Sequence, residues 1–420
     1  MKKLTLCLAL VSLLGMGGQA FALIDTIDAV PAATLLLPYF EVDLTNANGV
    51  DTLFSINNAS ATAILAHVTI WSDQSVPVLD FDVYLTGYDV QTISLRDIFV
   101  NGNLPVTASF GQDPKDTISP QGPVSDDITF ASCSTLPYPR PFVSASFRAH
   151  LQAVLQGNAS PATGQCAGSK TKDNILRGYV TVDAVNACNT IFPSDLALYA
   201  PFLTFQNVLW GDVFYVNSAQ NFAQGETLVH IEACQQCFTA GEHTFYGRYN
   251  GGNAASVLDF REALPTTLAA RFVNGGPFNG GTDFLVWREA NAAASSYGCA
   301  NQGPPSWYPL PSTQIVIFDE EEQPVTQSEC PSGDPTCTQT VLIPNEAQRV
   351  DVAADLLAPF DFGWAYLNLQ HTKLVAGYGD TFAQAWVLTT MDAEGRFSVG
   401  FDAIQLDNAN FPNTTIIPVP

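Results

Sequence analysis

The residues best suited to chemistry are two cysteines and two histidines within a short stretch of the chain. Cys234 and Cys237 form a C-x-x-C pair, which His230 precedes and His243 follows. Thiolate sulfur and imidazole nitrogen are the ligands of tetrahedral zinc sites, so these four residues could hold a zinc ion. A c-type haem is excluded, because Phe238 stands where the C-x-x-C-H motif has its histidine.

The same cysteine pair has two other interpretations. A redox dithiol needs its C-x-x-C at the start of a helix in a βαβ unit, which the sequence around Cys234 does not predict. In an oxidising compartment, Cys234 and Cys237 instead pair with each other or with other cysteines. We favour this structural interpretation, with His230 simply lying in a strand over residues 227–233.

A second cluster of ligand atoms could hold calcium. Residues 43–51 gather carboxylate and amide oxygens around Gly49. The segment departs from the EF-hand pattern, because Leu44 stands where an aspartate belongs. We favour an Asn-Gly hairpin turn with solvated acids, and we expect no other cofactor. The acidic run at residues 319–322 is likewise expected at an exposed hairpin tip.

Signatures of a hydrolase are weak. The sequence contains neither a G-x-S-x-G elbow nor an H-E-x-x-H motif. Three of the five histidines, His67, His230 and His371, lie in or beside expected strands, where a packed or hydrogen-bonded role is the commoner one. Forty acidic residues make some carboxylate pair inevitable, so such a pair carries no information. Whether the protein is an enzyme stays uncertain, and a non-catalytic role is favoured.

The N-terminus has the pattern of a secretory signal peptide. Lys2 and Lys3 precede an apolar run over residues 4–14, and an A-x-A cleavage site ends at Ala22. We therefore expect residues 1–22 to be removed and the protein to be exported, to the periplasm, the cell surface or the medium. No later segment has 18 uninterrupted apolar residues, so no membrane span is expected.

Cysteine usage agrees with export. Cys7 lies in the leader, which leaves an even number of cysteines in a compartment where disulfides persist. The disulfide candidates are Cys133, Cys166, Cys188, Cys234, Cys237, Cys299, Cys330 and Cys337. Short loops favour pairing Cys330 with Cys337 and Cys133 with Cys166.

Composition excludes several classes of function. The formal net charge is −24, which argues against binding to nucleic acid or to anionic membranes. Hydrophobic residues make up 47% of the chain and charged residues 13%. This balance is that of a globular protein and excludes an acidic disordered chain.

The elements that must position these residues are mostly strands. Period-2 alternation recurs, for example at residues 66–71, 178–182 and 314–318, between turn signals. Helical periodicity is convincing once, where Ser146 is expected to cap a helix that ends at Gly157. The sequence therefore predicts an all-β protein with one short helix.

The order of these strands is repeated. Residues 38–42, 51–59, 66–73, 88–95 and 177–183 correspond in order to residues 270–274, 281–290, 313–320, 345–352 and 362–368. A hairpin ends each half, with strands at 212–216 and 227–233 in the first and at 385–389 and 397–403 in the second. About seven strands per half predicts two tandem immunoglobulin-like β-sandwich domains, over residues 23–260 and 261–420. The first carries an insertion at about residues 99–176, and insertions are where function usually lies on such scaffolds.

Three strand segments carry a resemblance. Residues 36–43 (LLPYFEVD), 78–90 (VLDFDVYLTGYDV) and 177–183 (RGYVTVD) resemble segments of an uncharacterised family of secreted bacterial β-sandwich proteins. The resemblance covers strand motifs through most of the chain. It implies export from a bacterium and brings with it no activity, cofactor or catalytic residue.

These observations favour a non-catalytic secreted or cell-surface protein, stabilised by disulfides, that binds an extracellular protein or glycan. The alternative is an extracellular hydrolase acting on a polymer such as a glycan. Self-association is a further expectation, because the apolar run at residues 32–40 could add as a strand to a second copy. The other interpretation of that run, a first strand in its own sandwich, is favoured, although Pro38 counts against a central position.

Overall fold

The computed structural model describes residues 30–105, 143–171, 173–237, 243–250, 259–290, 296–299, 308–327, 341–371, 383–409 and 415–418. Antiparallel strands dominate these ranges, and the helices are short. The predicted all-β class is confirmed in this coarse form.

The first half of the chain forms two sheets. Sheet 1 has the order β11 (Val229–Ile231), β1 (Thr34–Asp43), β7 (Ile175–Val185), β3 (Ile64–Ser72), β4 (Pro77–Leu85). Sheet 2 has the order β10 (Phe222–Thr227), β9 (Asp212–Asn217), β2 (Val50–Asn58), β5 (Val90–Ser94), with β8 (Leu209–Trp210) also paired to β2.

The second half forms two more sheets. Sheet 3 has the order β16 (Pro324–Gln327), β15 (Gln314–Asp319), β18 (Phe362–Asn368), β12 (Thr267–Val273), β21 (Ile404–Gln405). Sheet 4 has the order β17 (Ala347–Asp351), β13 (Gly281–Arg288), β19 (Ala385–Asp392), β20 (Ser398–Asp402). A two-stranded ribbon of β6 (Gln165–Cys166) and β14 (Tyr297–Gly298) joins the two halves.

The helices are short, and α2 is the longest of those described. They are α2 (Ala145–Leu155), α3 (Leu196–Tyr199), η1 (Asp97–Asn101), η4 (Ala200–Phe202), η5 (Ser218–Gln220) and η6 (Gly247–Asn250). α2 is the helix predicted from the sequence, but its cap is Ser144 and not Ser146, because the Ser144 hydroxyl accepts the hydrogen bond from the Phe147 amide at 3.2 Å. Gly157 follows its end with a φ of +64°, as a helix terminator does.

The strand orders of the two halves correspond position by position. If the strands of each half are numbered in chain order, the same numbers are neighbours in both halves. Sheet 1 then matches sheet 3 written as β21-β12-β18-β15-β16, and sheet 2 matches sheet 4 written as β20-β19-β13-β17. One assignment made from the sequence is wrong. The strand that corresponds to β20 is β10, and residues 229–231 correspond to β21 instead.

This order differs from that of a constant-type immunoglobulin domain. There the first strand shares a sheet with the second and fifth, and the seventh shares one with the third and sixth. Here β1 lies in the sheet of β3 and β7, whereas β9 lies in the sheet of β2 and β5. The pairs β2–β5 and β3–β7 are those that an immunoglobulin domain also has.

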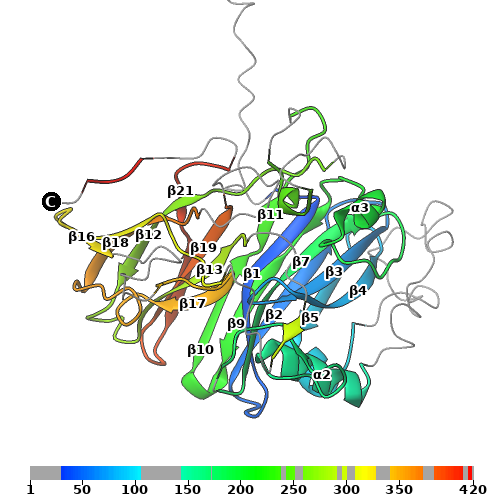
Figure 1. Cartoon of the computed structure of the whole chain (residues 1–420), viewed down its shortest axis with the longest axis horizontal. Coiled ribbons are helices and arrows are strands. Elements are labelled where there is room, and N and C mark those ends of the chain that lie inside the picture. The colour runs from blue at the N-terminus through cyan, green and yellow to red at the C-terminus, as the bar shows by residue number, and fades with distance from the viewer. Residues whose placement is uncertain are drawn as a thin grey trace, which may run out of the picture.

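The four sheets stack as layers. Apolar side chains of sheets 3 and 4 meet in one core, which includes Phe272, Phe284 and Leu367. The opposite face of sheet 4, with Trp287 and Trp386, belongs to the core of the first half. Strands β13, β17 and β19 contact β1 across this boundary, and Figure 1 shows the two halves side by side, with β1 and β13 adjacent at the centre.

The apolar run at residues 32–40 lies in this centre. β1 pairs with β11 on one side and with β7 on the other, and its side chains are buried on both faces. The strand therefore belongs to its own sheet, the interpretation favoured from the sequence. Pro38 is tolerated because the register shifts between Leu37 and Phe40, and a bulge needs no ladder hydrogen bond from the proline.

Candidate functional site

An aromatic pair lies on the outer face of sheet 3. Phe318 of β15 stands directly opposite Trp364 of β18, and their rings stack with centroids 4.3 Å apart and planes 8° apart. Alternation along β18 turns Phe362, Trp364 and Tyr366 to the outer face, while Gly363 and Ala365 turn inward. Phe318 is buried with Val316 and Tyr366, whereas Trp364 is partly exposed, so Trp364 is the member of the pair that a ligand can reach.

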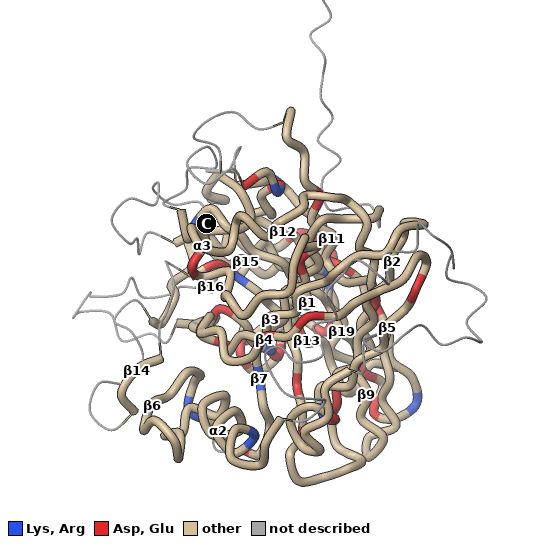
Figure 2. Tube along the Cα trace, turned by 90° about the vertical axis from the view of Figure 1, so that its right-hand side faces the viewer, with Lys and Arg blue, Asp and Glu red and all other residues tan. Residues whose placement is uncertain are grey.

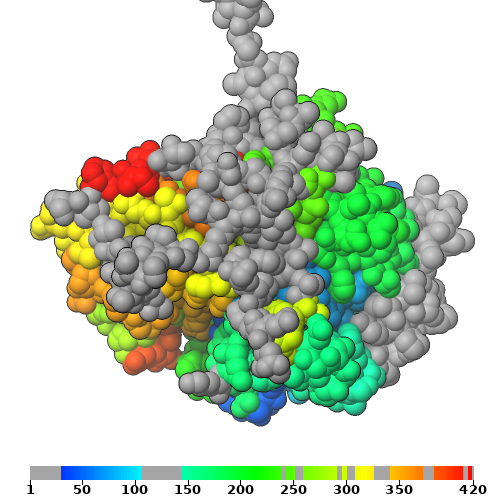
Figure 3. All heavy atoms as spheres, viewed as in Figure 1, coloured from blue at the N-terminus to red at the C-terminus, as the bar shows by residue number. Residues whose placement is uncertain are grey.

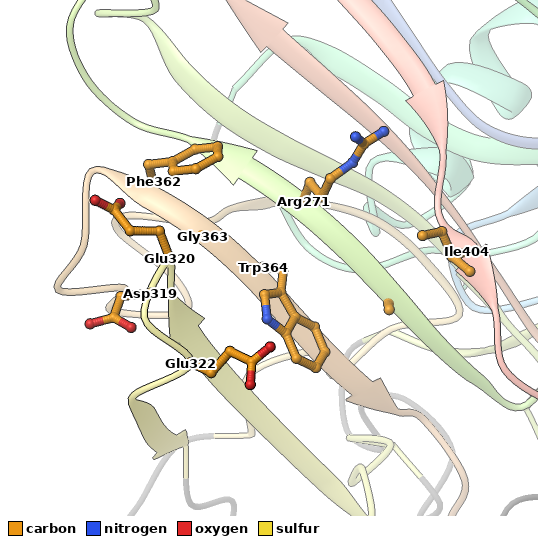
Figure 4. A pocket seen from close by; sticks show the side chains of 9 residues that line it. Arg271, Asp319, Glu320, Glu322, Phe362, Gly363, Trp364 and Ile404 are labelled. Carbon is orange, nitrogen blue, oxygen red and sulfur yellow. The ribbon is translucent and has the colours of Figure 1, made fainter.

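A cavity of 290 Å³ opens at this pair, and we call it the Trp364 pocket. Its lining residues are Ala269, Arg271, Asp319, Glu320, Glu322, Phe362, Gly363, Trp364 and Ile404. Phe362 and Ile404 are 49% and 57% exposed, which leaves apolar surface available to a ligand. Figure 4 shows the acids on the hairpin side of Trp364 and Arg271 on the opposite side.

The acids come from the turn between β15 and β16. Asp319 holds this turn, because its Oδ1 accepts hydrogen bonds from the amides of Glu321 at 2.9 Å and Gln323 at 2.7 Å. Glu322 has a φ of +61°, and its carboxylate points toward the Trp364 indole in Figure 4. The predicted exposed acidic hairpin tip is therefore confirmed, and it borders a pocket that the sequence did not reveal.

Arg271 is positioned by the aromatic side chain of Phe401. Its guanidinium lies 4.9 Å from the centroid of Phe401, a cation–π distance. Beyond the pocket, the C-terminal segment at Ile417 exchanges two hydrogen bonds with the Gln314 side chain. In Figure 3 this red segment lies against yellow residues of the second half.

The predicted zinc ligands do not form a metal site. Cys234 and Cys237 are joined in a disulfide, so neither sulfur is a thiolate. His230 has both ring nitrogens engaged, Nδ1 with the Val30 carbonyl at 2.7 Å and Nε2 with the Gly211 amide at 3.3 Å. Burial lowers the pKa of His230 and of His243, which favours neutral imidazoles. Nowhere in the described part do three histidine, cysteine, aspartate or glutamate side chains gather closely enough to hold a metal ion.

The predicted calcium segment is a turn that uses its own oxygens. The Asp43 carboxylate accepts hydrogen bonds from the Thr45 amide at 2.8 Å and from the Asn46 amide at 2.9 Å. Asp51 accepts from Ser94 and Arg96 at the other end. The contacts of Asp43 are those of the expected turn, whereas Asp51 is partly buried and bonded to residues outside it, and is not the solvated acid that the sequence predicted.

The disulfides are partly as predicted. Besides Cys234–Cys237, Cys166 of β6 pairs with Cys299 beside β14, which overturns the expected partnership of Cys166 with Cys133. The ribbon of β6 and β14 brings these distant cysteines together, and loop length alone could not show that. Cys188 is also disulfide-bonded. Cys133, Cys330 and Cys337 lie outside the described residues.

A second cavity, of 720 Å³, lies beside β4 and α2. Asp80 and His150 are among its lining residues. Burial raises the pKa of Asp80 to about 6. Behind Asp80, His67 contacts the Asp82 carboxylate through Nδ1 at 2.9 Å, and its Nε2 lies 3.9 Å from Asp80. Although burial lowers it, the pKa of His67 is raised by these carboxylates, foremost Asp82.

Sequence reasoning assigned no role to Trp364, Phe362, Arg271 or Asp80. A signal for the first pair existed, since Phe362 and Trp364 alternate with small residues and so place large aromatic rings on one face. Nothing in the sequence indicated that Phe362 and Trp364 stay accessible on this face, whereas the corresponding face of the first half is covered.

Comparison of the chain with protein-family models, with curated proteins and with solved structures finds no match. Within the described ranges, no helix is long and apolar enough to cross a membrane.

Proposed function

We propose that this is a non-catalytic, exported binding protein that contacts an extracellular protein or glycan through the Trp364 pocket. The observation that carries the proposal is a pocket in which the partly exposed Trp364 and the exposed Phe362 are bordered by carboxylates. An aromatic face supplies apolar contact, and the acids supply hydrogen-bond acceptors that select a ligand. Figure 2 shows lysine and arginine at few positions along the chain, so the surface as a whole is acidic.

The alternative, a hydrolase acting on a polymer, has less support. A glycoside hydrolase of the usual kind positions two carboxyl groups across the scissile bond. Of the described residues that line the larger cavity, Asp80 is the only acid. The three acids of the Trp364 pocket all come from one turn, so they do not flank a bond from two sides.

Binding assays on the mature protein test the proposal. Trp364→Ala is expected to weaken binding of a ligand found in a panel of extracellular glycans and peptides by at least about tenfold, since stacking on an aromatic anchor is lost. Phe214→Ala is the matched control, because Phe214 is a 49% exposed aromatic residue on a sheet of the first half. Equal losses in both variants, or turnover of a polymer by the wild type, would contradict a binding role for the pocket.

We also propose that the two halves are tandem copies of one sandwich. Besides strand order, Gly178 and Gly363 occupy matching sites, because a Cβ on either would collide with the carbonyl oxygen of Trp71 or Phe318 respectively. An experimental structure in which sheets 1 and 2 do not superpose on sheets 3 and 4 would exclude this. The strand order that the two halves share would then be a coincidence.

Export is the third part of the proposal. The disulfides Cys166–Cys299 and Cys234–Cys237 support this part, because disulfides persist in oxidising compartments. N-terminal sequencing of the protein recovered from an exporting cell should begin at Leu23. Free thiols at Cys234 and Cys237 in that material would contradict the assignment.

A further inference from the structure

The Trp364 pocket has a counterpart in the first half of the chain. Trp71 of β3 stands opposite Tyr179 of β7 in the same register as Phe318 and Trp364, and these two rings also stack, with planes 3° apart. The turn after Trp71 has the same length as the turn after Phe318. Within it, Ser75 (φ +59°) stands where Glu322 (φ +61°) stands in the second half.

In the first half, the chain itself fills this site. Tyr249 stacks on Trp71 with centroids 6.0 Å apart and planes 11° apart. Arg248 donates to the Ser75 hydroxyl at 2.9 Å and to the Tyr179 hydroxyl at 3.0 Å, and it forms a buried ion pair with Glu346. An arginine followed by a tyrosine therefore covers the aromatic pair.

The Trp364 pocket is better suited to a cation than its counterpart at Trp71, which Arg248 and Tyr249 fill. Glu322 replaces the neutral Ser75, and Glu320 replaces Asp73 at the same turn. Three acids line the Trp364 pocket against one arginine, and that arginine is held over Phe401 on the far side. A guanidinium binds carboxylates through paired donors and also stacks on an indole face.

We propose that the Trp364 pocket binds a peptide segment of a partner protein, through an arginine side chain next to an aromatic one. The proposal deepens the binding function proposed above and rests on it. The arginine contacts Glu322 and Glu320, and the aromatic ring packs on the accessible part of Trp364 beside Phe362. The arrangement follows that of Arg248, which contacts Ser75 at the position of Glu322, and of Tyr249, which stacks on the equivalent aromatic pair.

Isothermal titration of the mature protein tests this with three peptides, acetyl-Gly-Arg-Tyr-Gly-amide and its versions with citrulline or lysine at the arginine. The arginine peptide is expected to bind saturably. The citrulline peptide, which keeps the shape and loses the charge, should bind at least about tenfold more weakly. The lysine peptide should fall between them, because an ammonium lacks the planar fork.

Protein variants locate the site. Glu322→Gln should weaken the arginine peptide at least about tenfold, and Trp364→Ala by a similar factor, with the melting temperature showing that each variant is folded. Glu321→Gln should leave affinity unchanged within about twofold, because Glu321 shares the turn but does not line the pocket.

Equal affinity for the arginine and citrulline peptides, equal effects of Glu321→Gln and Glu322→Gln, or no saturable binding at millimolar peptide would each overturn the proposal. If a glycan instead binds and Trp364→Ala abolishes that binding, the arginine proposal fails while the binding function stands. If Trp364→Ala affects no ligand of the folded protein, both fail.

Discussion

At the scale of single residues, the fold contains carboxyl groups whose charge is costly. Asp80 is 5% exposed, and its Oδ2 has no hydrogen-bond partner within the described structure. A carboxylate taken out of water loses solvation that His67, at 3.9 Å, restores only in part. The pKa of Asp80 is accordingly raised from an ordinary value of 3.8 to about 6.

Stability should therefore depend on pH through Asp80. Because its pKa is higher in the folded chain, the protonated group favours folding below about pH 4, and this contribution is lost as the pH rises through about 6. Asp80→Asn removes this titrating group. Between pH 4 and pH 7 the free energy of unfolding of the wild type should therefore fall by up to about 3 kcal/mol relative to that of the variant. Urea unfolding at several pH values measures this. A difference that does not change with pH, or the same trend in Glu321→Gln, would show that Asp80 is not responsible.

At the scale of elements, the two glycines of β7 and β18 let neighbouring strands approach closely. At Gly178 and Gly363 the backbone carbonyl of the adjacent strand and a phenylalanine ring, Phe40 or Phe272, occupy the space of a side chain. These rings lie in the two cores, so a shift at either glycine would disturb the packing of sheet against sheet.

Alanine at either glycine should destabilise the protein to a similar degree. The added methyl group must displace backbone, so each of Gly178→Ala and Gly363→Ala should cost about 1–3 kcal/mol or more in the free energy of unfolding. Gly164→Ala is the comparison, since no atom lies within 4 Å of its Cβ position and only its φ of +71° opposes alanine. Its cost should be nearer 1 kcal/mol. A loss of stability in only one of Gly178→Ala and Gly363→Ala would show that the two glycines have different environments.

Much of the element order could be predicted from the sequence, because alternation and turn residues are local signals. The central position of β1 was harder, since Pro38 is compatible with it only through a bulge that the sequence does not show. Arg248 was not predicted to matter, because its partners Ser75, Tyr179 and Glu346 are remote in sequence. The accessibility of Trp364 was missed for the same reason, as exposure depends on what else packs there.

At the scale of the whole molecule, the two halves share a core and a buried charge pair. Leu285, Trp287 and Leu388 of sheet 4 pack into the core of the first half. The ion pair of Arg248 with Glu346 joins the segment after β11 to the start of β17, and both side chains are nearly inaccessible to water. The disulfide between Cys166 and Cys299 links the halves a third time.

We therefore expect the halves to unfold together in one transition. Separating them would expose a large apolar face, and it would break the buried ion pair of Glu346 with Arg248. Arg248→Ala has the second effect alone, so it should lower the free energy of unfolding by about 3–5 kcal/mol. Arg148→Ala, at a partly exposed side chain that donates one hydrogen bond to the Asn101 carbonyl, should lower it by no more than about 1 kcal/mol. Scanning calorimetry should give a single peak for the wild type, shifted to lower temperature but not split by Arg248→Ala. Two peaks, of which Arg248→Ala moves only one, would show that each half folds on its own and that the shared core contributes little.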